Sequence, residues 1–303
     1  MTRAIQIVEV GPRDGLQNEK AILEPADRAA FIHRLEACGV TRIEAVSFVN
    51  PKRVPQMAGA EEIMADLPRA AGRSRIGLVL NERGWDRALA AGVDEANVVV
   101  CATDGFGIRN QGASVAEQVA AMAAIANRRA AEGGPPISVT ISVAFGCPFD
   151  GEVSEDQVTA IVREAAALDV AEIALADTIG VADPWTVRRR VEAAAAVARD
   201  KRLRLHFHDT RGTGLANAYA GVEAGVTVLD ASCGGLGGCP FAPNATGNIA
   251  TEDLVYMLER AGCDTGLDLD GLIAAGRWIG EKIGKPSISS LSRAGGFPAR
   301  AAA

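Results

Sequence analysis

Short runs of β-branched and apolar residues alternate with longer Ala-rich stretches along most of the chain. This alternation predicts strands separated by amphipathic helices, because strands are short and rich in branched residues whereas helices are longer. Eight runs are strand candidates, and they lie at residues 4–10, 41–48, 75–80, 95–101, 137–145, 171–176, 202–207 and 226–231. Most of them are separated by segments with helical spacing.

Residues typical of helix ends support these segments. Pro25 stands at the start of a helical segment, Asp27–Ala37, and Asp183-Pro184 opens a helix that reaches about Arg199. Ser154-Glu155-Asp156-Gln157 is a candidate capping box. Three Gly-containing units each end a helical pattern just before a strand, where glycine adopts the left-handed terminating conformation at little cost. They are Cys38-Gly39-Val40, Ala91-Gly92-Val93 and Ala224-Gly225-Val226.

Eight strands alternating with helices favour an α/β protein with a closed (β/α)₈ TIM barrel over an open doubly wound sheet. A barrel at residues 1–285 would place the chemistry at the C-terminal strand ends. From about residue 265 the chain predicts one more helix, a short C-terminal extension. The stretch 286–303 is expected to be an irregular tail at the surface or at a subunit contact. No linker divides the chain.

Composition restricts the class of protein further. The 303 residues are 48% hydrophobic and 23% charged, which excludes a mainly disordered chain. A net charge of −7 argues against a general nucleic-acid or anionic-membrane partner, although a local basic pocket stays compatible with it. No run of about 18 apolar residues predicts a membrane span. No signal or transit segment is recognised before the first strand, and the expected compartment is the cytoplasm.

The six cysteines lie far apart, in a chain long enough to fold without a disulfide framework, and are predicted to be reduced thiols. Cys38, Cys101 and Cys263 suit the role of small buried hydrophobes. Cys147, before Pro148, is intermediate. Cys239 suits that role poorly, because it lies in a polar, glycine-dense stretch.

Two of the three histidines stand together in Leu205-His206-Phe207-His208-Asp209-Thr210, whereas His33, in a helical pattern, is interpreted as structural. Side chains at i and i+2 of a strand point to the same side, so His206 and His208 face one space at the end of the seventh strand. Two buried histidines held by neighbours would be the ordinary interpretation. Their position at a barrel mouth favours a metal site instead, and a metal requires further ligands.

Carboxylates end several of the other strands. Arg13, Asp14 and Gln17 cluster after the first strand, in a segment whose Pro12 and Gly15 are turn formers. Glu44 in the second strand could face solvent, the barrel interior or the site. Asp177 after the sixth strand fits either a helix N-cap or a residue that orients substrate.

A glycine-dense loop, Gly234-Gly235-Leu236-Gly237-Gly238-Cys239-Pro240, follows the eighth strand. Its spacing differs from a dinucleotide-binding fingerprint. Such a loop can move over a bound substrate, and a cysteine on it can deliver a proton.

The chain resembles the hydroxymethylglutaryl-CoA (HMG-CoA) lyases, metal-dependent TIM-barrel enzymes, from about residue 5 to 285. Val8–Glu19 (VEVGPRDGLQNE) and the glycine loop are the most specific matches. Further matches are Ser47–Lys52 with Val54–Met57, Gly146–Phe149, Asp177–Val181, His206–Thr210 and Gly247–Leu258.

The resemblance implies a metal site made by Asp14, His206, His208 and Asn248. It matches Arg13 to an enolate-stabilising cation, Cys239 to the catalytic thiol of the mobile loop, and Glu44 to an active-site carboxylate. Gln17 and Asp177, with Arg13, are the predicted substrate-binding residues. Mixed nitrogen and oxygen ligands favour Mg²⁺ or Mn²⁺, and geometry alone would also admit Zn²⁺.

The implied reaction is a retro-Claisen cleavage of a 3-hydroxyacyl-CoA, which with HMG-CoA gives acetyl-CoA and acetoacetate, the chemistry of leucine degradation and ketone-body formation. His206 or Asp14 would remove the hydroxyl proton. A homodimer or higher homo-oligomer is expected, with an acyl-CoA as the small-molecule partner.

The chain departs from the family pattern at a few positions that bear on the acyl group: Thr103, Asp104, Thr140 and Arg211. Alternative hypotheses are a lyase for another 3-hydroxyacyl-CoA such as citramalyl-CoA, and a condensing synthase of the isopropylmalate type. A non-catalytic acyl-CoA binder is a third, disfavoured by the presence of metal set, arginine and thiol together.

Overall fold

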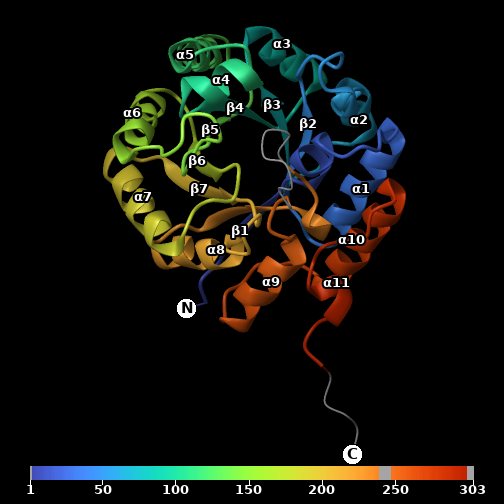
Figure 1. Cartoon of the computed structure of the whole chain (residues 1–303). Coiled ribbons are helices and arrows are strands. Elements are labelled where there is room, and N and C mark those ends of the chain that lie inside the picture. Colours follow the sequence, from blue (N-terminus) through green and yellow to red (C-terminus); the bar gives the residue numbers. More distant parts are fainter. Residues whose placement is uncertain (1, 239–246, 299–303) are drawn as a thin grey trace, which may run out of the picture.

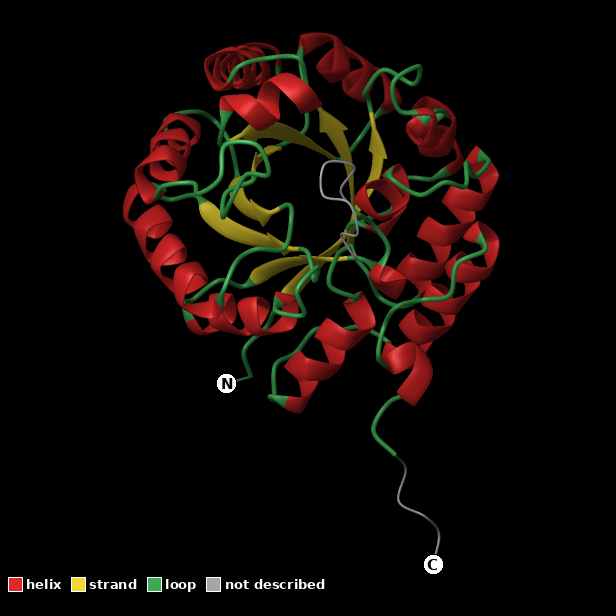
Figure 2. Cartoon of the chain, viewed as in Figure 1, coloured by secondary structure: helices red, strands yellow, loops and turns green. Residues whose placement is uncertain are grey.

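A computed structural model describes residues 2–238 and 247–298 of the chain. Within these ranges, eight parallel strands pair in sequence order and the eighth pairs with the first, which closes a barrel. Figure 1 looks into this barrel, and Figure 2 shows the strands as an inner ring surrounded by helices. The predicted (β/α)₈ architecture is confirmed.

The strands lie where the sequence pattern predicts them. They are β1 (Gln6–Glu9), β2 (Arg42–Ser47), β3 (Ser74–Val79), β4 (Glu95–Cys101), β5 (Ile137–Ser142), β6 (Glu172–Asp177), β7 (Arg202–Phe207) and β8 (Val228–Ala231). Pairing of β1 with β8 runs from Gln6 opposite Val228 to Glu9 opposite Ala231. The first and last strands therefore share one edge of the mouth.

Helices cover the outside of the barrel and pack on a continuous apolar core. They are α1 (Pro25–Ala37), α2 (Ala60–Asp66), α3 (Glu82–Ala91), α4 (Asp104–Asn110), α5 (Val115–Glu132), α6 (Glu155–Ala166), α7 (Pro184–Val197), α8 (Gly214–Glu223), α9 (Thr251–Arg260), α10 (Leu269–Ile283) and α11 (Leu291–Ala294). A π-helical turn, η1 (Gly11–Gly15), follows β1, and two 3₁₀ turns are η2 (Pro55–Met57) and η3 (Cys233–Gly235). None of the described helices combines the length and apolarity needed to cross a bilayer.

The predicted helix ends are confirmed. Ser154 and Gln157 form a reciprocal capping box at α6, and Asp183 caps α7 through the amides of Trp185 and Thr186. Gly225 ends α8 at φ +101°, a conformation that a β-carbon would strain. These local signals fix where each helix turns back into a strand.

The segment after residue 285 differs from the irregular tail that the sequence predicts. Residues 291–294 form α11, and the Asp253 carboxylate accepts hydrogen bonds from the amides of Ser290 and Leu291 and from the Ser289 hydroxyl. The Ile288 amide donates to the Gly234 carbonyl at 3.2 Å. Asp253 thus fastens the tail to α9, and the Ile288–Gly234 hydrogen bond fastens it to the start of the glycine-rich loop.

Candidate functional site

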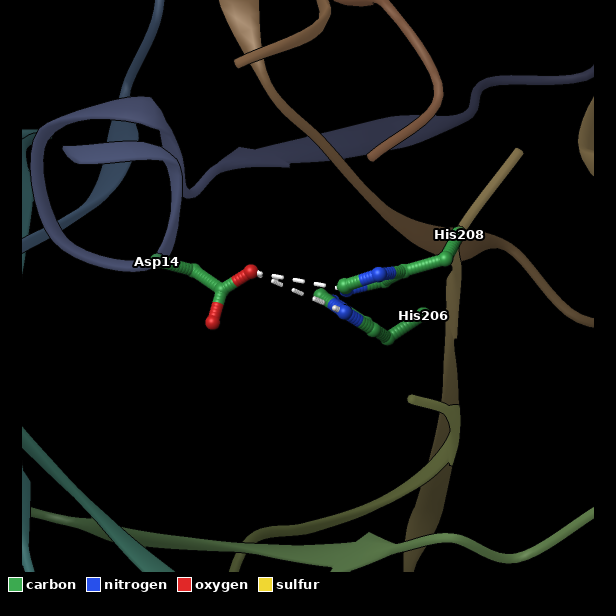
Figure 3. Close-up of side chains that lie close together, drawn as sticks. All are labelled: Asp14, His206 and His208. Atoms are coloured by element: carbon green, nitrogen blue, oxygen red, sulfur yellow. Dashed lines mark ion pairs between the residues drawn. The ribbon is translucent and has the colours of Figure 1, made fainter. Parts of the chain in front are cut away.

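The mouth of the barrel gathers one carboxylate and two imidazoles from opposite ends of the chain. Asp14 lies on η1 after β1, and His206 and His208 lie at the end of β7. Figure 3 shows both rings directed at one Asp14 oxygen. Nε2 of His208 lies 3.7 Å from Oδ2 of Asp14, and Nε2 of His206 lies 4.0 Å from it. One ligand atom from each residue lies within 4.8 Å of the other two, the spacing of a metal site.

Asn248 joins this cluster through the backbone and its side chain. It forms a β-bridge with His208, and its Nδ2 donates to Asp14 Oδ2 at 2.8 Å and to the Leu236 carbonyl at 3.0 Å. Its Oδ1 is buried without a hydrogen-bond partner among the described residues, and an oxygen buried in this way costs about 1–3 kcal/mol. The donor set, a carboxylate, two imidazoles and an amide, fits a divalent cation of the Mg²⁺ or Mn²⁺ type.

Charge in the site is arranged to keep Asp14 ionised. Burial would raise the pKa of Asp14, but the charge of Arg13 and the two neighbouring imidazoles, His206 and His208, together hold that pKa well below its usual value. About 15% of the Asp14 side chain is exposed, so the cluster opens toward the mouth. A permanently negative oxygen that is open to the mouth is what a cation site requires.

Arg13 is held by two acids, as its place beside Asp14 suggests. Its Nε donates to Glu44 Oε2 at 2.6 Å, and its Nη1 donates to Asp14 Oδ1 at 2.8 Å. Asn97 donates to the second Glu44 oxygen at 2.9 Å. Of the three orientations that the sequence leaves open, Glu44 therefore has the one that faces the barrel interior, where it contacts Arg13. The Nη atoms of Arg13 keep further N–H groups for a ligand.

His206 is oriented by an acid that the sequence interpretation missed. Asp230 of β8 lies with its Oδ2 3.2 Å from Nδ1 of His206, which leaves Nε2 facing Asp14. Burial would lower the pKa of His206, but the Asp230 contact and the Asp14 charge outweigh it and raise that pKa. The available signal was a carboxylate at i+2 from Val228, on the inward side of an otherwise apolar strand.

Three other predicted site residues lie outside this cluster. Asp177 is buried with both oxygens accepting, from the amides of Val181 and Ala182, so it organises its own loop, and Asp183 rather than Asp177 caps α7. The substrate-binding role of Asp177 stays a prediction. Gln17 is half-buried on the turn after η1, and its side chain makes no hydrogen bond within 2–238 and 247–298. Cys239 falls outside the described residues.

The remaining cysteines fit the predicted reduced state. Cys38, Cys101, Cys147 and Cys233 are buried free thiols, and Cys263 is a partly exposed one. The Cys147 sulfur receives hydrogen bonds from the amides of Phe149 and Asp150, so it stabilises the loop after β5. Cys263 is more exposed than predicted, because it follows the end of α9 near the surface.

The four family departures serve distinct purposes. Thr103 donates to the Cys147 sulfur, and Asp104 accepts from the amide of Val115 at the start of α5. Arg211 donates to the carbonyls of Ile179 and Gly180 and thereby links two rim loops. Thr140 points into the barrel interior toward Asn97. They are therefore distributed over the rim and the interior of the barrel.

Two buried glutamates hold the loops of the site from below. Glu9 accepts from the amides of Gly11 and Cys233, at 2.7 and 2.9 Å, and so ties η1 to η3. Glu252 accepts from the Gly234 amide at 3.0 Å. Burial, the largest effect, raises the pKa of each glutamate to about 7. The sequence pattern does not predict the burial of these two glutamates, because a glutamate at the end of a strand or at a helix start is usually solvated.

This burial predicts a pH-dependent stability. Between an unfolded pKa of 4.5 and a folded pKa of about 7, the folded chain keeps protons that the unfolded chain releases, so stability falls as pH rises. Because glutamine does not titrate, Glu252→Gln is expected to reduce the fall in unfolding free energy over this pH range by on the order of 3 kcal/mol, at about 1.4 kcal/mol per pKa unit. Urea unfolding from pH 5 to pH 8 measures it. A slope equal to that of the parent protein would contradict the assignment, and the exposed Glu82→Gln is the control.

Comparisons with known proteins place this geometry in a family. Residues 4–279 match the HMGL-like family. The chain is 44% identical to (R)-citramalyl-CoA lyase of Chloroflexus aurantiacus, over 96% of the chain and 95% of that protein. It is 40% identical to the 3-hydroxy-3-isohexenylglutaryl-CoA/hydroxymethylglutaryl-CoA lyase of Pseudomonas aeruginosa, over 97% of the chain and 98% of that protein. An HMG-CoA lyase of Acinetobacter baumannii, solved with coenzyme A and 3-methylmalate, superposes with a TM-score of 0.92 at 38% identity, covering 98% of each chain.

Proposed function

Since the chain belongs to the HMGL-like family, we propose that it is a metal-dependent carbon–carbon lyase that cleaves HMG-CoA to acetyl-CoA and acetoacetate. The observation that carries this proposal is the convergence of Asp14, His206 and His208 on one point, with Arg13 beside them. The relative solved with coenzyme A supports an acyl-CoA as the substrate class.

Asp14, His206, His208 and Asn248 would hold the divalent ion, Mg²⁺ or Mn²⁺. When bound, the ion supplies Lewis acidity that lowers the pKa of the substrate hydroxyl. The side chains of the chain then have separate tasks. His206 or Asp14 takes the proton from the C3 hydroxyl. The C2–C3 bond then breaks, and the C3–O single bond becomes the C=O double bond of the ketone.

The electron pair of the broken bond passes to the thioester as an enolate. The Nη groups of Arg13, fixed in place by Glu44, donate hydrogen bonds to the enolate oxygen. The Cys239 thiol then protonates C2 to give acetyl-CoA. The hydroxyl proton is gained by the base, and the proton added to C2 comes from the thiol. Release of a proton from the base to solvent and uptake of one by the thiolate restore both groups.

Cys239→Ala is expected to lose most turnover, because it lacks the thiol that protonates C2 after the carbon–carbon bond breaks. Mn²⁺ binding should stay as in the parent protein, because Cys239 is not among the residues that would hold the ion. Steady-state kinetics and Mn²⁺ titration measure the two properties. Cys263→Ala is the matched control, because this partly exposed thiol lies beside the Ala4–Asp264 bridge, which precedes β1. Unchanged turnover in Cys239→Ala would remove the thiol from the mechanism.

Citramalyl-CoA is the second candidate substrate, favoured by the 44% identity to a citramalyl-CoA lyase. It carries the same tertiary hydroxyl and methyl group as HMG-CoA but has its carboxylate one methylene closer. One methylene in a pocket discriminates by only about 1–3 kcal/mol, so the same machinery could act on either ester.

A substrate panel tests the proposal. The purified protein with Mg²⁺ or Mn²⁺ is incubated with HMG-CoA, citramalyl-CoA and longer 3-hydroxyacyl-CoA esters, and the keto acid is identified by mass. Acetoacetate from HMG-CoA with the highest kcat/KM is the expected result. Pyruvate from citramalyl-CoA as the dominant product would select the second candidate, and no cleavage of any ester would reject lyase activity.

A further inference from the structure

Charged side chains fill the barrel interior beneath the site, where TIM barrels usually hold branched apolar residues. Arg42 of β2 reaches across the barrel to Glu95 of β4 at 2.7 Å and to Glu172 of β6 at 2.8 Å. Above it, Arg204 of β7 is about 1% exposed. A guanidinium buried this deeply must be paired, because an isolated buried charge is very costly.

One side of Arg204 leads to the metal-site histidine. Its Nε lies 3.3 Å from Asp230 Oδ1, an ion contact whose angles fall short of a hydrogen bond. The second Asp230 oxygen holds Nδ1 of His206 at 3.2 Å. Asp230 thus lies between Arg204 and the imidazole, so the place of its carboxylate depends on both.

The other side of Arg204 leads to the catalytic arginine. Its Nη2 donates to the Thr140 hydroxyl at 3.1 Å, and that hydroxyl donates to Asn97 Oδ1 at 2.9 Å. The Asn97 amide nitrogen donates to Glu44, which accepts from Arg13. The three bonds from Arg204 to Thr140, Asn97 and Glu44 run in one direction, and Glu44 at the end accepts from both Asn97 and Arg13, so donors and acceptors match at each step.

Neutralising the interior carboxylates does not by itself explain Arg204. Glu172 already receives Arg42 at 2.8 Å and Arg202 at 2.7 Å, whereas Arg204 approaches it only to 3.3 Å. The contacts peculiar to Arg204 are those with Asp230 and Thr140. Both of them lead upward to the site.

We propose that Arg204 is a positioning residue for the lyase reaction: through Asp230 it orients His206, and through Thr140 and Asn97 it orients Glu44 and Arg13. The inference rests on the proposed function for its kinetic part. Its metal-binding part is independent of the substrate. Partners that orient a metal ligand typically contribute 10–100-fold in metal affinity or activity.

The first test is Arg204→Gln, with Mn²⁺ binding followed by electron paramagnetic resonance in the absence of substrate. We expect Mn²⁺ affinity to fall roughly 10–100-fold, and kcat to fall by a similar factor with KM little changed. Arg202→Gln is the matched control. It makes the same substitution two residues earlier, removes another partner of Glu172, and touches neither Asp230 nor Thr140. Both properties should stay at the parent values.

A second variant separates the two sides of Arg204. Thr140→Val removes the hydroxyl at nearly constant shape and leaves the Arg204–Asp230 contact in place. We expect kcat to fall, with KM and Mn²⁺ affinity unchanged, because this variant disturbs only the side that leads to Arg13. Arg204→Lys keeps a charge for Asp230 but lacks the forked geometry, so it should restore Mn²⁺ affinity more than kcat.

The proposal is overturned if Arg204→Gln binds Mn²⁺ and turns over like the parent protein, or if Arg202→Gln loses as much as Arg204→Gln. Equal kcat in Thr140→Val and the parent also overturns it. If circular dichroism shows that Arg204→Gln does not fold, Thr140→Val decides. If the parent protein cleaves no ester, the proposed function fails, and the Mn²⁺ titrations of Arg204→Gln and Arg202→Gln alone support or reject the positioning of His206.

Discussion

Arg13→Met is expected to lower kcat roughly 100- to 1000-fold, or about 3–4 kcal/mol, with a much smaller change in KM. The guanidinium is buried, and although burial opposes its charge, Glu44 and Asp14 outweigh that effect and raise its pKa. It is therefore a fixed cation that is largely shielded from solvent. A cation of this kind stabilises an enolate far more than the neutral thioester from which the enolate forms.

Steady-state kinetics with the best ester of the panel measure the effect. Arg128→Met, on the outer helix α5, is the control, since that arginine pairs with surface acids away from the mouth. A loss confined to KM would assign Arg13 to ground-state binding of the substrate. Glu44→Gln should reproduce part of the kcat loss, because it weakens the ion pair that fixes the guanidinium.

Asp14→Asn is expected to abolish both Mn²⁺ binding and cleavage. The carboxylate supplies the negative charge on which both imidazoles converge, and an amide offers only a neutral oxygen. The loss in Mn²⁺ affinity should exceed the roughly 10–100-fold typical of partners that only orient a ligand. A chelator should give the same loss of cleavage in the parent protein, and added Mg²⁺ or Mn²⁺ should restore it.

Mn²⁺ titration and activity in chelator check this expectation. Asp183→Asn is the control, because asparagine caps α7 about as well as aspartate and the Asp183 side chain accepts hydrogen bonds only from Trp185 and Thr186 among the described residues. Full activity of the parent protein in chelator, or parent-like Mn²⁺ affinity in Asp14→Asn, would refute the metal site.

The sequence predicts the barrel and the main residues of the cluster for physical reasons. Strand and helix periods are local, so runs of branched residues and Ala-rich stretches reveal the eight units. His206 and His208 are readable because a two-residue spacing on a strand forces one orientation. Asp14 is readable because a polar cluster after a strand of a parallel barrel must lie at the mouth.

The residues that support the cluster are not readable in the same way. Asp230 approaches His206 from a different strand, and Glu9 meets Cys233 across more than 200 positions. Nothing local distinguishes Glu9 from a solvated glutamate at a strand end. The inward position of Asp230 can be inferred from its strand, but its partner cannot, since the closure of the sheet brings the two residues together. The same holds for Arg204, whose contacts come from β5, β6 and β8.

The site joins the two extremes of the polypeptide. Asp14 and Asn248 lie 234 positions apart and touch at 2.8 Å, where the turn after β1 meets the segment that precedes α9. A nascent or truncated chain that ends before β8 therefore carries Asp14 and both imidazoles without the amide that completes the set. Tight capture of Mn²⁺ should thus report completion of the ring during refolding, and a metal-sensitive signal would mark the last step of assembly rather than early collapse.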